Sequence, residues 1–316
     1  MSSNGKYKII VLHDNKEWFS FLKEAFKEYD VTMEQWISDE IDFDVTSDPP
    51  KNAVFYNRCS PSSYVRGHRL SLDQARVIIQ WLRSHNRIVV NGEMAIDVED
   101  SKAYQYVMAK KSGLNVPKTI FTSNPTAQLI EENFGKDSAF VIKPNRGGRG
   151  LNVRKFDNLA DFEHDTEPLQ STTGLYVIQA FIPLTSGLFR AEFVGKKYLY
   201  TSKATACDGF NSNFCPCEVP RDRFKILPDL EDPFIENCTN FFRTTTLENG
   251  AIEYIYDANG VPYVIDINCN TGYNTEAEDE AGSKQGYVEV AKYVYSRVTE
   301  LRKSHAEKLK RLDVIQ

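Results

Sequence analysis

The sequence predicts an α/β unit followed by an α+β unit, and three patterns lead to this fold class. Over roughly the first hundred residues, short β-rich runs alternate with helical patterns, which is typical of a parallel sheet covered by helices. From Ser123 onward the order becomes helix, strand, glycine-rich turn, strand, helix and strand. Residues 250–274 contain two apolar runs around Asn259-Gly260, which predicts a late β-hairpin.

The N-terminal elements follow from hydrophobic spacing. Residues 7–12 and 53–57 are short β-rich runs, and residues 87–90 form a third. Helical spacing covers residues 17–29 and 71–84, where apolar side chains recur on one stripe. A further helix is expected over residues 101–112, because a capping residue precedes it and Gly113 can close it.

The remaining elements belong to the α+β part. Pro117 opens a strand, so we place a boundary near residue 116. A hairpin is expected to turn at Gly195, and a helix is expected near residues 232–247. The chain ends in a helix from about Lys284, whose charged residues fit a solvated face.

Composition limits the classes of function. The 316 residues carry a net charge of −6 with a pI near 5.5, which argues against a nucleic-acid partner. The first thirty residues contain no cleavable apolar segment, and no run of eighteen apolar residues occurs, so we expect a cytoplasmic protein with no membrane partner. An oligomer is compatible with the sequence.

Six cysteines are too sparse for a disulfide framework and fit a reducing compartment. Cys207, Cys215 and Cys217 cluster, but their spacing matches no zinc pattern and lacks a second pair. Free thiols in or near a loop are the expected state.

The late hairpin carries candidate metal ligands. A two-residue type I′ turn at Asn259-Gly260 would place Glu253 directly opposite Asp266, with Asn268 on the same face. Opposed carboxylates repel each other unless a cation lies between them, and oxygen ligands suit Mg²⁺. The alternative is a hairpin whose acidic residues simply face water.

Three basic features stand upstream of that hairpin. Lys143 lies on a strand before Gly147, Gly148 and Gly150, whose backbone N–H groups could approach phosphate; a plain hairpin turn with a surface lysine is the alternative. Lys102 begins a helix, where a cation is mildly unfavourable because of the helix dipole. A bound phosphate would remove this cost, and an exposed lysine at small cost is the alternative.

The third basic feature is Arg190, which lies on an otherwise apolar strand and needs an anionic partner if it points inward. An ordinary ion pair would satisfy it as well as a ligand would.

In this order, the features resemble the ATP-grasp superfamily, and in particular its RimK-like, glutamate-ligase-like branch. The similarity covers about residues 85–300. It rests on SKAYQYVMAKKSGLNVPKT, the strand ending in Gln179 to Ile182, FIPLTSGLFRAEFVGKKYLY, GFNSN and DINCNTGYN. The resemblance implies an N-terminal domain over residues 1–116, a small lid lobe over 117–182 and a large lobe over 183–316.

The resemblance also implies site residues. Lys102 and Lys143 would hold the α- and β-phosphates of ATP under the glycine lid, while Arg190 and Asn213 would steady the γ-phosphate or an acyl-phosphate. The hinge that reads adenine would be Gln179, Ala180, Phe181 and Ile182, and the ligands of Mg²⁺, or of Mn²⁺, would be Glu253, Asp266 and Asn268.

The implied activity is an ATP-dependent carboxylate–amine ligase that joins small-molecule substrates, an amino acid or a peptide among them. A small-molecule kinase and a non-catalytic ATP-binding regulator are the alternatives. Ala180 and Leu188 stand where the branch carries acids, and Asn211 stands where it carries an arginine, which puts the ribose contacts and a dicarboxylate substrate in doubt. Residues 56–69 either face the substrate or form an ordinary loop.

Overall fold

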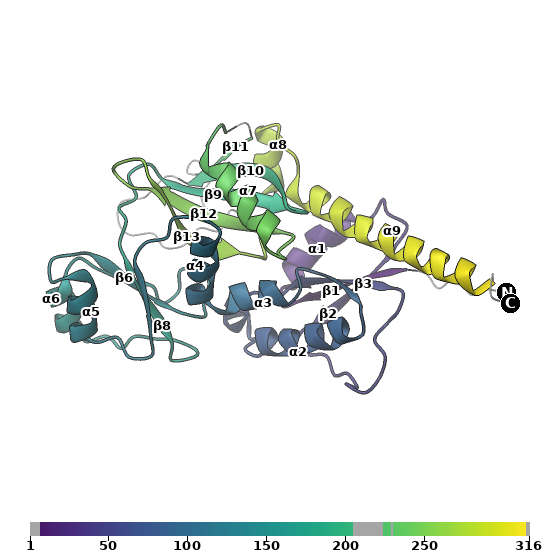
Figure 1. Cartoon of the computed structure of the whole chain (residues 1–316), viewed down its shortest axis with the longest axis horizontal. Coiled ribbons are helices and arrows are strands. Elements are labelled where there is room, and N and C mark those ends of the chain that lie inside the picture. Colours follow the sequence, from purple (N-terminus) through teal and green to yellow (C-terminus); the bar gives the residue numbers. More distant parts are fainter. Residues whose placement is uncertain (1–6, 205–223, 229, 314–316) are drawn as a thin grey trace.

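The computed structural model describes residues 7–204, 224–228 and 230–313, and within them the chain forms three sheets (Figure 1). The N-terminal sheet, the small-lobe sheet and the large sheet follow one another along the chain. The predicted combination of α/β and α+β parts is confirmed.

The N-terminal sheet is parallel throughout, in the order β2-β1-β3-β4. Its apolar residues alternate between two cores: Ile9 and Val11 pack toward α1 and α9, whereas Ile10 and Leu12 pack toward α2. The elements of this part are β1 (Lys8–His13), α1 (Lys16–Ala25), β2 (Thr32–Ile37), β3 (Ala53–Arg58), the 3₁₀ helix η1 (Pro61–Arg66), α2 (Ser71–Ser84), β4 (Ile88–Val90) and α3 (Glu93–Asp100).

The small-lobe sheet is antiparallel, in the order β5-β8-β6-β7. Its core contains Phe140, Phe156 and Ile178 and is closed by α5 and α6. The elements are β5 (Thr119–Thr122), α5 (Ala127–Phe134), β6 (Phe140–Pro144), β7 (Arg154–Phe156), α6 (Leu159–His164) and β8 (Tyr176–Ala180).

The large sheet has the order β11-β10-β9-β12-β13, and its two faces differ. One face packs Ala191, Phe193 and Ile252 into a core shared with α4 and α7. The opposite face carries the charged residues described below. The elements are α4 (Lys102–Lys111), β9 (Leu188–Val194), β10 (Lys197–Ala204), β11 (Phe224–Leu227), α7 (Phe234–Thr244), β12 (Gly250–Tyr256), β13 (Pro262–Asn268) and α8 (Thr275–Glu280).

Helix α9 (Gly286–Asp313) joins the large sheet to the N-terminal sheet. Val290 and Val294 pack in one core with Val11 of β1 and Val194 of β9. In Figure 1 the helix runs from the large sheet across α1 to the end where both termini lie. Among the described residues, no helix has both the length and the apolar character needed to cross a membrane.

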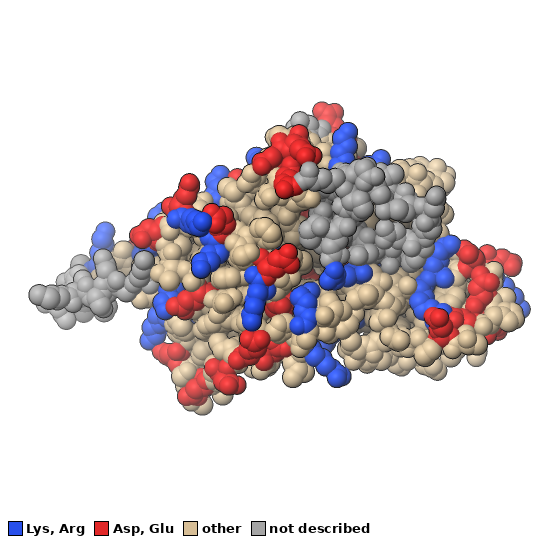
Figure 2. Space-filling model, turned by 180° about the vertical axis from the view of Figure 1, so that it is seen from behind, with Lys and Arg blue, Asp and Glu red and all other residues tan. Residues whose placement is uncertain are grey.

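Acidic and basic side chains are interspersed on the face shown in Figure 2. The sequence patterns missed β2, η1, α3, β11 and α8. Strand β2 is an edge strand with the sequence TMEQWI, and Ile37 is its only buried residue. Its sequence therefore shows neither the alternation of apolar and polar residues nor the apolar run by which a strand is predicted.

Candidate active site

A cavity of about 390 Å³ lies between the small-lobe sheet and the β12–β13 hairpin. Glu253 and Asp266 line its large-sheet side. All the residues expected to bind the nucleotide line it as well: Lys102, Lys143, Gly147, Gly148, Gly150, Gln179, Ala180, Phe181 and Ile182. Asn213 lies outside the described residues, as do Asn211, Cys207, Cys215 and Cys217.

The β12–β13 hairpin places Glu253 opposite Asp266, as the sequence predicts, but by a different route. The expected two-residue type I′ turn is wrong: the N–H groups of Gly260 and Val261 bond to Asp257, and only Gly260 in the turn has positive φ. The loop is therefore one residue longer than expected. A β-bulge at Ile265 adds one residue to β13 and restores the register.

The bulge also supplies an acceptor to the cavity. The carbonyl oxygen of Ile265 accepts a hydrogen bond from the Tyr106 hydroxyl at 2.8 Å and from Lys143 Nζ at 3.3 Å. A regular ladder would direct that carbonyl toward β12 instead. The irregularity thus positions the α4 tyrosine and the β6 lysine against β13.

Four charged side chains lie in one row across the face of the large sheet, with the two acids Asp266 and Glu253 between the two cations Lys102 and Arg190. Lys102 Nζ lies 2.7 Å from Asp266 Oδ1, and Arg190 Nη1 lies 2.5 Å from Glu253 Oε1. Asn268 Nδ2 donates to the same oxygen of Glu253 at 3.1 Å. Lys102 is only 7% exposed, which excludes the surface-lysine alternative. The acidic residues are likewise not the solvated face of a free hairpin.

The pKa values reflect this row. Burial raises the pKa of Glu253 to about 7, with a further contribution from Asp266, against the opposing effects of Arg190 and Lys102. Burial alone would lower the pKa of Lys102, but the Asp266 carboxylate outweighs it, and the pKa lies above its ordinary value. Two buried carboxylates so close together require the neighbouring cations.

Lys143 has a different environment. Its ammonium donates to Gln179 Oε1 at 2.8 Å and to the Tyr106 hydroxyl at 3.2 Å, so its hydrogen-bond acceptors, including the Ile265 carbonyl, are neutral groups. Burial, together with the nearby charge of Lys102, lowers its pKa to about 8. An anion entering the cavity would restore the charged form.

The glycine lid rests on the N-terminal part. A Cβ atom added at Gly148 would meet Ser62 Cβ of η1 at 3.2 Å. Arg146 fixes the base of the lid by ion pairs with Asp73 of α2, at 3.0 Å, and with Asp100 of α3. The glycine turn therefore lies against η1, α2 and α3 of the N-terminal part in this structure.

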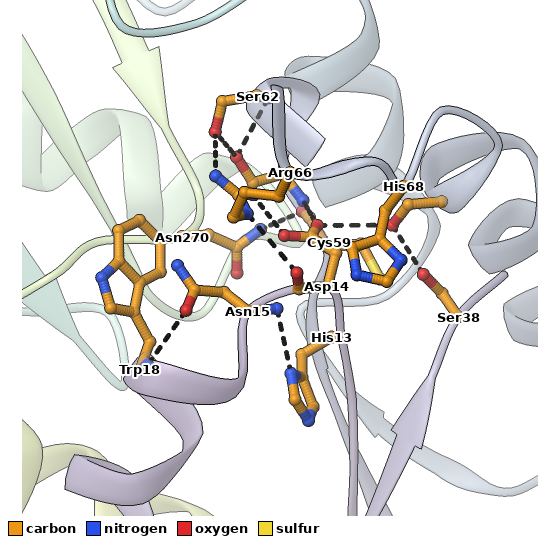
Figure 3. A network of polar contacts seen from close by, with 12 residues as sticks. His13, Asp14, Asn15, Trp18, Ser38, Cys59, Ser62, Arg66, His68 and Asn270 are labelled. Atoms are coloured by element: carbon orange, nitrogen blue, oxygen red, sulfur yellow. Dashed lines mark hydrogen bonds and ion pairs between the residues drawn. The ribbon is translucent and has the colours of Figure 1, made fainter. Parts of the chain in front are cut away.

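The strand ends beside the lid carry a polar network (Figure 3). Arg66 bonds to Asp14, at the end of β1, and donates to Ser62 Oγ at 3.1 Å. Asp14 also accepts from the backbone N–H of Ser60 at 2.8 Å. Asn270, which follows β13, donates to the Cys59 carbonyl, so the network ties the N-terminal sheet to the large sheet.

The sequence and the structure were compared with those of known proteins. No family model and no curated protein matches the sequence. Solved structures match it over most of its length: D-cycloserine synthetase DcsG (15% identity, 92% of this chain and 99% of that one, TM-score 0.65) and the ATP-grasp ligase PsnB complexed with minimal precursor, Mg and ADP (13%, 94% and 99%, TM-score 0.66). A RimK domain ATP-grasp protein from Sphaerobacter thermophilus DSM 20745 matches as well (13%, 90% and 98%, TM-score 0.64).

The chain has the ATP-grasp fold. This confirms the fold that the resemblance implies, while membership of the superfamily and of its RimK-like branch stays a prediction. The cavity is lined by residues of both the small-lobe sheet and the large sheet, and the predicted hinge, Gln179 to Ile182, forms part of its wall.

Two of the predicted hinge residues use their backbone N–H groups in hydrogen bonds within the protein. The N–H of Ala180 donates to the Lys118 carbonyl at 2.9 Å, and that of Phe181 donates to the Ala139 carbonyl at 3.1 Å. Any backbone contact of these two residues with a base would therefore use their carbonyl oxygens. Lys155, which the sequence patterns did not single out, lies 4.7 Å from the centre of the Phe181 ring.

Two residues that support the walls of the cavity also escaped the sequence patterns. Glu99 accepts the N–H groups of Cys269, at 2.5 Å, and Asn270, at 3.0 Å, and so fixes the loop after β13; burial raises its pKa to about 8. Tyr106 links Lys143 to β13. Neither residue belongs to a motif that the sequence shows, because each contacts residues that are distant in the sequence.

Proposed function

We propose that the protein is an ATP-dependent carboxylate–amine ligase that forms an amide through an acyl-phosphate, with an amino acid or peptide among its substrates. The main support is that two lysines, a glycine lid and an opposed pair of carboxylates converge on one cavity between the lobes. Moving a phosphoryl group requires negative charge to be neutralised from several sides.

Lys102 and Lys143 would bind the α- and β-phosphates of ATP. Lys143 donates to a hydroxyl, a side-chain amide and a backbone carbonyl, so a phosphate oxygen would gain a buried charged hydrogen bond there. The lid glycines Gly147, Gly148 and Gly150 would cover the phosphates with backbone N–H groups and exclude water.

The acidic residues fit a divalent cation. Glu253 and Asp266 are opposed and mutually repelling, and Asn268 adds an amide group, an oxygen-based set that suits Mg²⁺ or Mn²⁺. The described residues contain no cluster of three His, Cys, Asp or Glu side chains that could hold a metal ion, and the proposed set has only two such residues, with Asn268 as the third. A bound Mg²⁺ would neutralise phosphate charge at this end of the cavity.

The reaction would proceed in two displacements. The substrate carboxylate oxygen attacks the γ-phosphorus, the bond to ADP breaks, and an acyl-phosphate forms. The amine nitrogen then attacks the acyl carbon, the bond to phosphate breaks, and the amine proton leaves with the phosphate or with a neighbouring base. Arg190 and Asn213 would hold the transferred group, so the protein contributes positioning and charge.

An ADP-release screen over pairs of amino acids and short peptides with Mg²⁺, followed by mass spectrometry, tests the proposal. We expect ADP formation that requires both substrates and a product whose mass is their sum minus water. A phosphorylated product formed without an amine would instead indicate a kinase. Nucleotide-dependent stabilisation without ADP formation would indicate a binding protein.

A further inference from the structure

The N-terminal sheet and the large sheet meet at a second polar site, beside the cavity. Arg58, the last residue of β3, donates from Nη2 to the Thr271 carbonyl at 2.6 Å. Next to that contact, Asn270 donates to the Cys59 carbonyl. We call the junction of these four residues, together with the neighbouring acids Glu192 and Glu278, the seam.

Arg58 is buried in the seam without a full set of partners. It is 4% exposed, and its Nε and Nη1 have no hydrogen-bond partner in the part of the chain that the structure describes. The nearby Asp14 carboxylate is already bonded to Arg66 and to the N–H of Ser60. A buried guanidinium with two unused donors is costly unless an anion satisfies them.

Two buried acids, in contrast, have carboxylate oxygens that lack hydrogen-bond donors. Glu192 is 1% exposed and Glu278 is fully buried, and each has one oxygen, Oε2, without a hydrogen-bond partner among the described residues. The other oxygen of Glu192 contacts Arg190 Nε at 2.7 Å, and that of Glu278 accepts from the Tyr200 hydroxyl at 2.7 Å. Burial and the charge of Glu192 raise the pKa of Glu278 to about 7, so a cation between the two acids would relieve a real repulsion.

The unused donors and acceptors are close to each other. Thr271 accepts from Arg58 through its carbonyl, and its side chain forms a hydrogen bond with the Glu192 carboxylate that acts to lower the pKa of that acid. Tyr273 lies within electrostatic reach of both Arg58 and Glu192. Tyr200, which pairs with Glu192 across β9 and β10, connects that acid to Glu278.

We propose that the seam is a subsite for a free α-amino acid, whose carboxylate binds Arg58 and whose ammonium binds Glu192 and Glu278. The proposal rests on the proposed ligase function and identifies the amine donor. Glu192 follows Arg190 on the same face of β9, so the amine end of the ligand lies toward the phosphoryl-transfer row and its carboxylate lies away from it. A peptide amine donor has no carboxylate next to its amine and does not fit.

A purely structural role for Arg58 is the competing explanation. The rings of Trp18, Tyr56 and Tyr287 lie 5.8–5.9 Å from its guanidinium carbon, and cation–π attraction stabilises a charge in such surroundings. It does not account for the two acids with unused oxygens at the same junction. Because the seam residues are almost fully buried, the amino acid has to enter while the two sheets separate.

The ligand-side experiment uses the unaltered protein with ADP and Mg²⁺. Thermal shift and calorimetry are run with each of the twenty amino acids and, for every one that binds, with its decarboxylated amine and its N-acetyl derivative. We expect at least one amino acid to bind and both analogues to bind at least about tenfold more weakly, because each lacks one charged partner. Absence of binding by every amino acid, or equal binding of either analogue, overturns the proposal.

The protein-side experiment compares Arg58→Gln and Glu278→Gln with Arg302→Gln. Arg302 is the matched control, since it also lies over two aromatic rings and donates to a backbone carbonyl, that of Asp30, far from the cavity. We expect both seam variants to lose at least about tenfold in amino-acid affinity and to keep ADP affinity, with no loss in the control. Arg58→Lys, which keeps the charge, replaces Arg58→Gln if that variant does not fold.

Amino-acid binding that survives in Arg58→Gln, or falls equally in Arg302→Gln, assigns Arg58 to the structural role. The proposed function fails on a different result, namely no substrate-dependent ADP release by the unaltered protein. A seam without amino-acid affinity in a protein that still releases ADP therefore rejects the subsite and leaves the ligase.

Discussion

Two lysines line the same cavity in opposite surroundings. Lys102 begins α4 and contacts the Asp266 carboxylate, which holds its pKa above the ordinary value despite burial. Lys143, on β6, contacts a side-chain amide, a hydroxyl and a carbonyl, and burial lowers its pKa to about 8. The large-lobe end of the cavity is therefore neutralised by the protein itself, and the small-lobe end is not.

The difference indicates that one lysine contributes mainly to the stability of the fold and the other mainly to ligand binding. The Lys102–Asp266 pair contributes to the folded state before any ligand arrives, because removing either partner leaves a buried charge. Lys143 carries a charge whose best partner is a ligand, so its contribution should appear in binding. The predictions below test this division, from the largest expected effect to the smallest.

Removing the partner of Lys102 should have the largest effect. Asp266→Ala leaves the Lys102 ammonium, which is 8% exposed, without its carboxylate. We expect the free energy of unfolding to fall by about 3 kcal/mol in urea denaturation, the lower end of the range for broken buried pairs, because Asp266 is partly exposed. The double variant Lys102→Met/Asp266→Leu is the control and should recover most of that loss; equal destabilisation of both would contradict the pairing.

Removing Lys143 should affect binding more than folding. Lys143→Met deletes a cation with neutral partners, so the free energy of unfolding should change by about 1 kcal/mol. Affinity for ADP, measured by calorimetry, should fall by roughly 10- to 100-fold, the value of one buried charged hydrogen bond. Lys143→Arg keeps the charge and should retain part of the affinity. A variant that loses stability but keeps ADP affinity would invert the comparison.

The lowered pKa of Lys143 makes both effects depend on pH. Between pH 8 and about 10 the unfolded chain holds the Lys143 proton and the folded chain does not, so this residue makes stability rise with pH there. Phosphate binding favours the charged form, so ADP affinity should fall over the same window, with proton uptake on binding. Calorimetry in buffers of different ionisation enthalpy measures that uptake, and Lys143→Met should abolish it.

The hairpin β12–β13 shows which structural details could be predicted from the sequence and which could not. The pairing of Glu253 with Asp266 was predicted correctly, yet the loop length was wrong and the bulge at Ile265 was not foreseen. A type I′ geometry, with two successive positive φ values, occurs instead at Gly195 and Lys196. Turn dipeptides specify local φ preferences, whereas the bulge depends on what its carbonyl contacts, here Tyr106 and Lys143 from other elements.

The site shows the same limit at longer range. The ordered motifs were sufficient to predict the fold and to name residues that gather around one cavity. Contacts such as those of Glu99 with the loop after β13, or of Arg58 with Thr271, join segments more than a hundred residues apart and leave no periodic trace. Residues 56–69 contain the end of β3 and η1, and whether they face a substrate stays a prediction.

The lid gives the smallest expected effect and tests whether the Lys143 end is the one that closes. Gly148→Ala would bring a methyl group to 3.2 Å from Ser62 Cβ, so η1 must shift by a few tenths of an ångström; Gly147→Ala meets Pro144 Cβ at an ordinary 3.6 Å and serves as the control. We expect Gly148→Ala to weaken ADP binding by less than about tenfold, less than about 1.4 kcal/mol, and Gly147→Ala to have no effect. Equal losses in the two variants would mean that the contact with η1 does not hold the lid over Lys143.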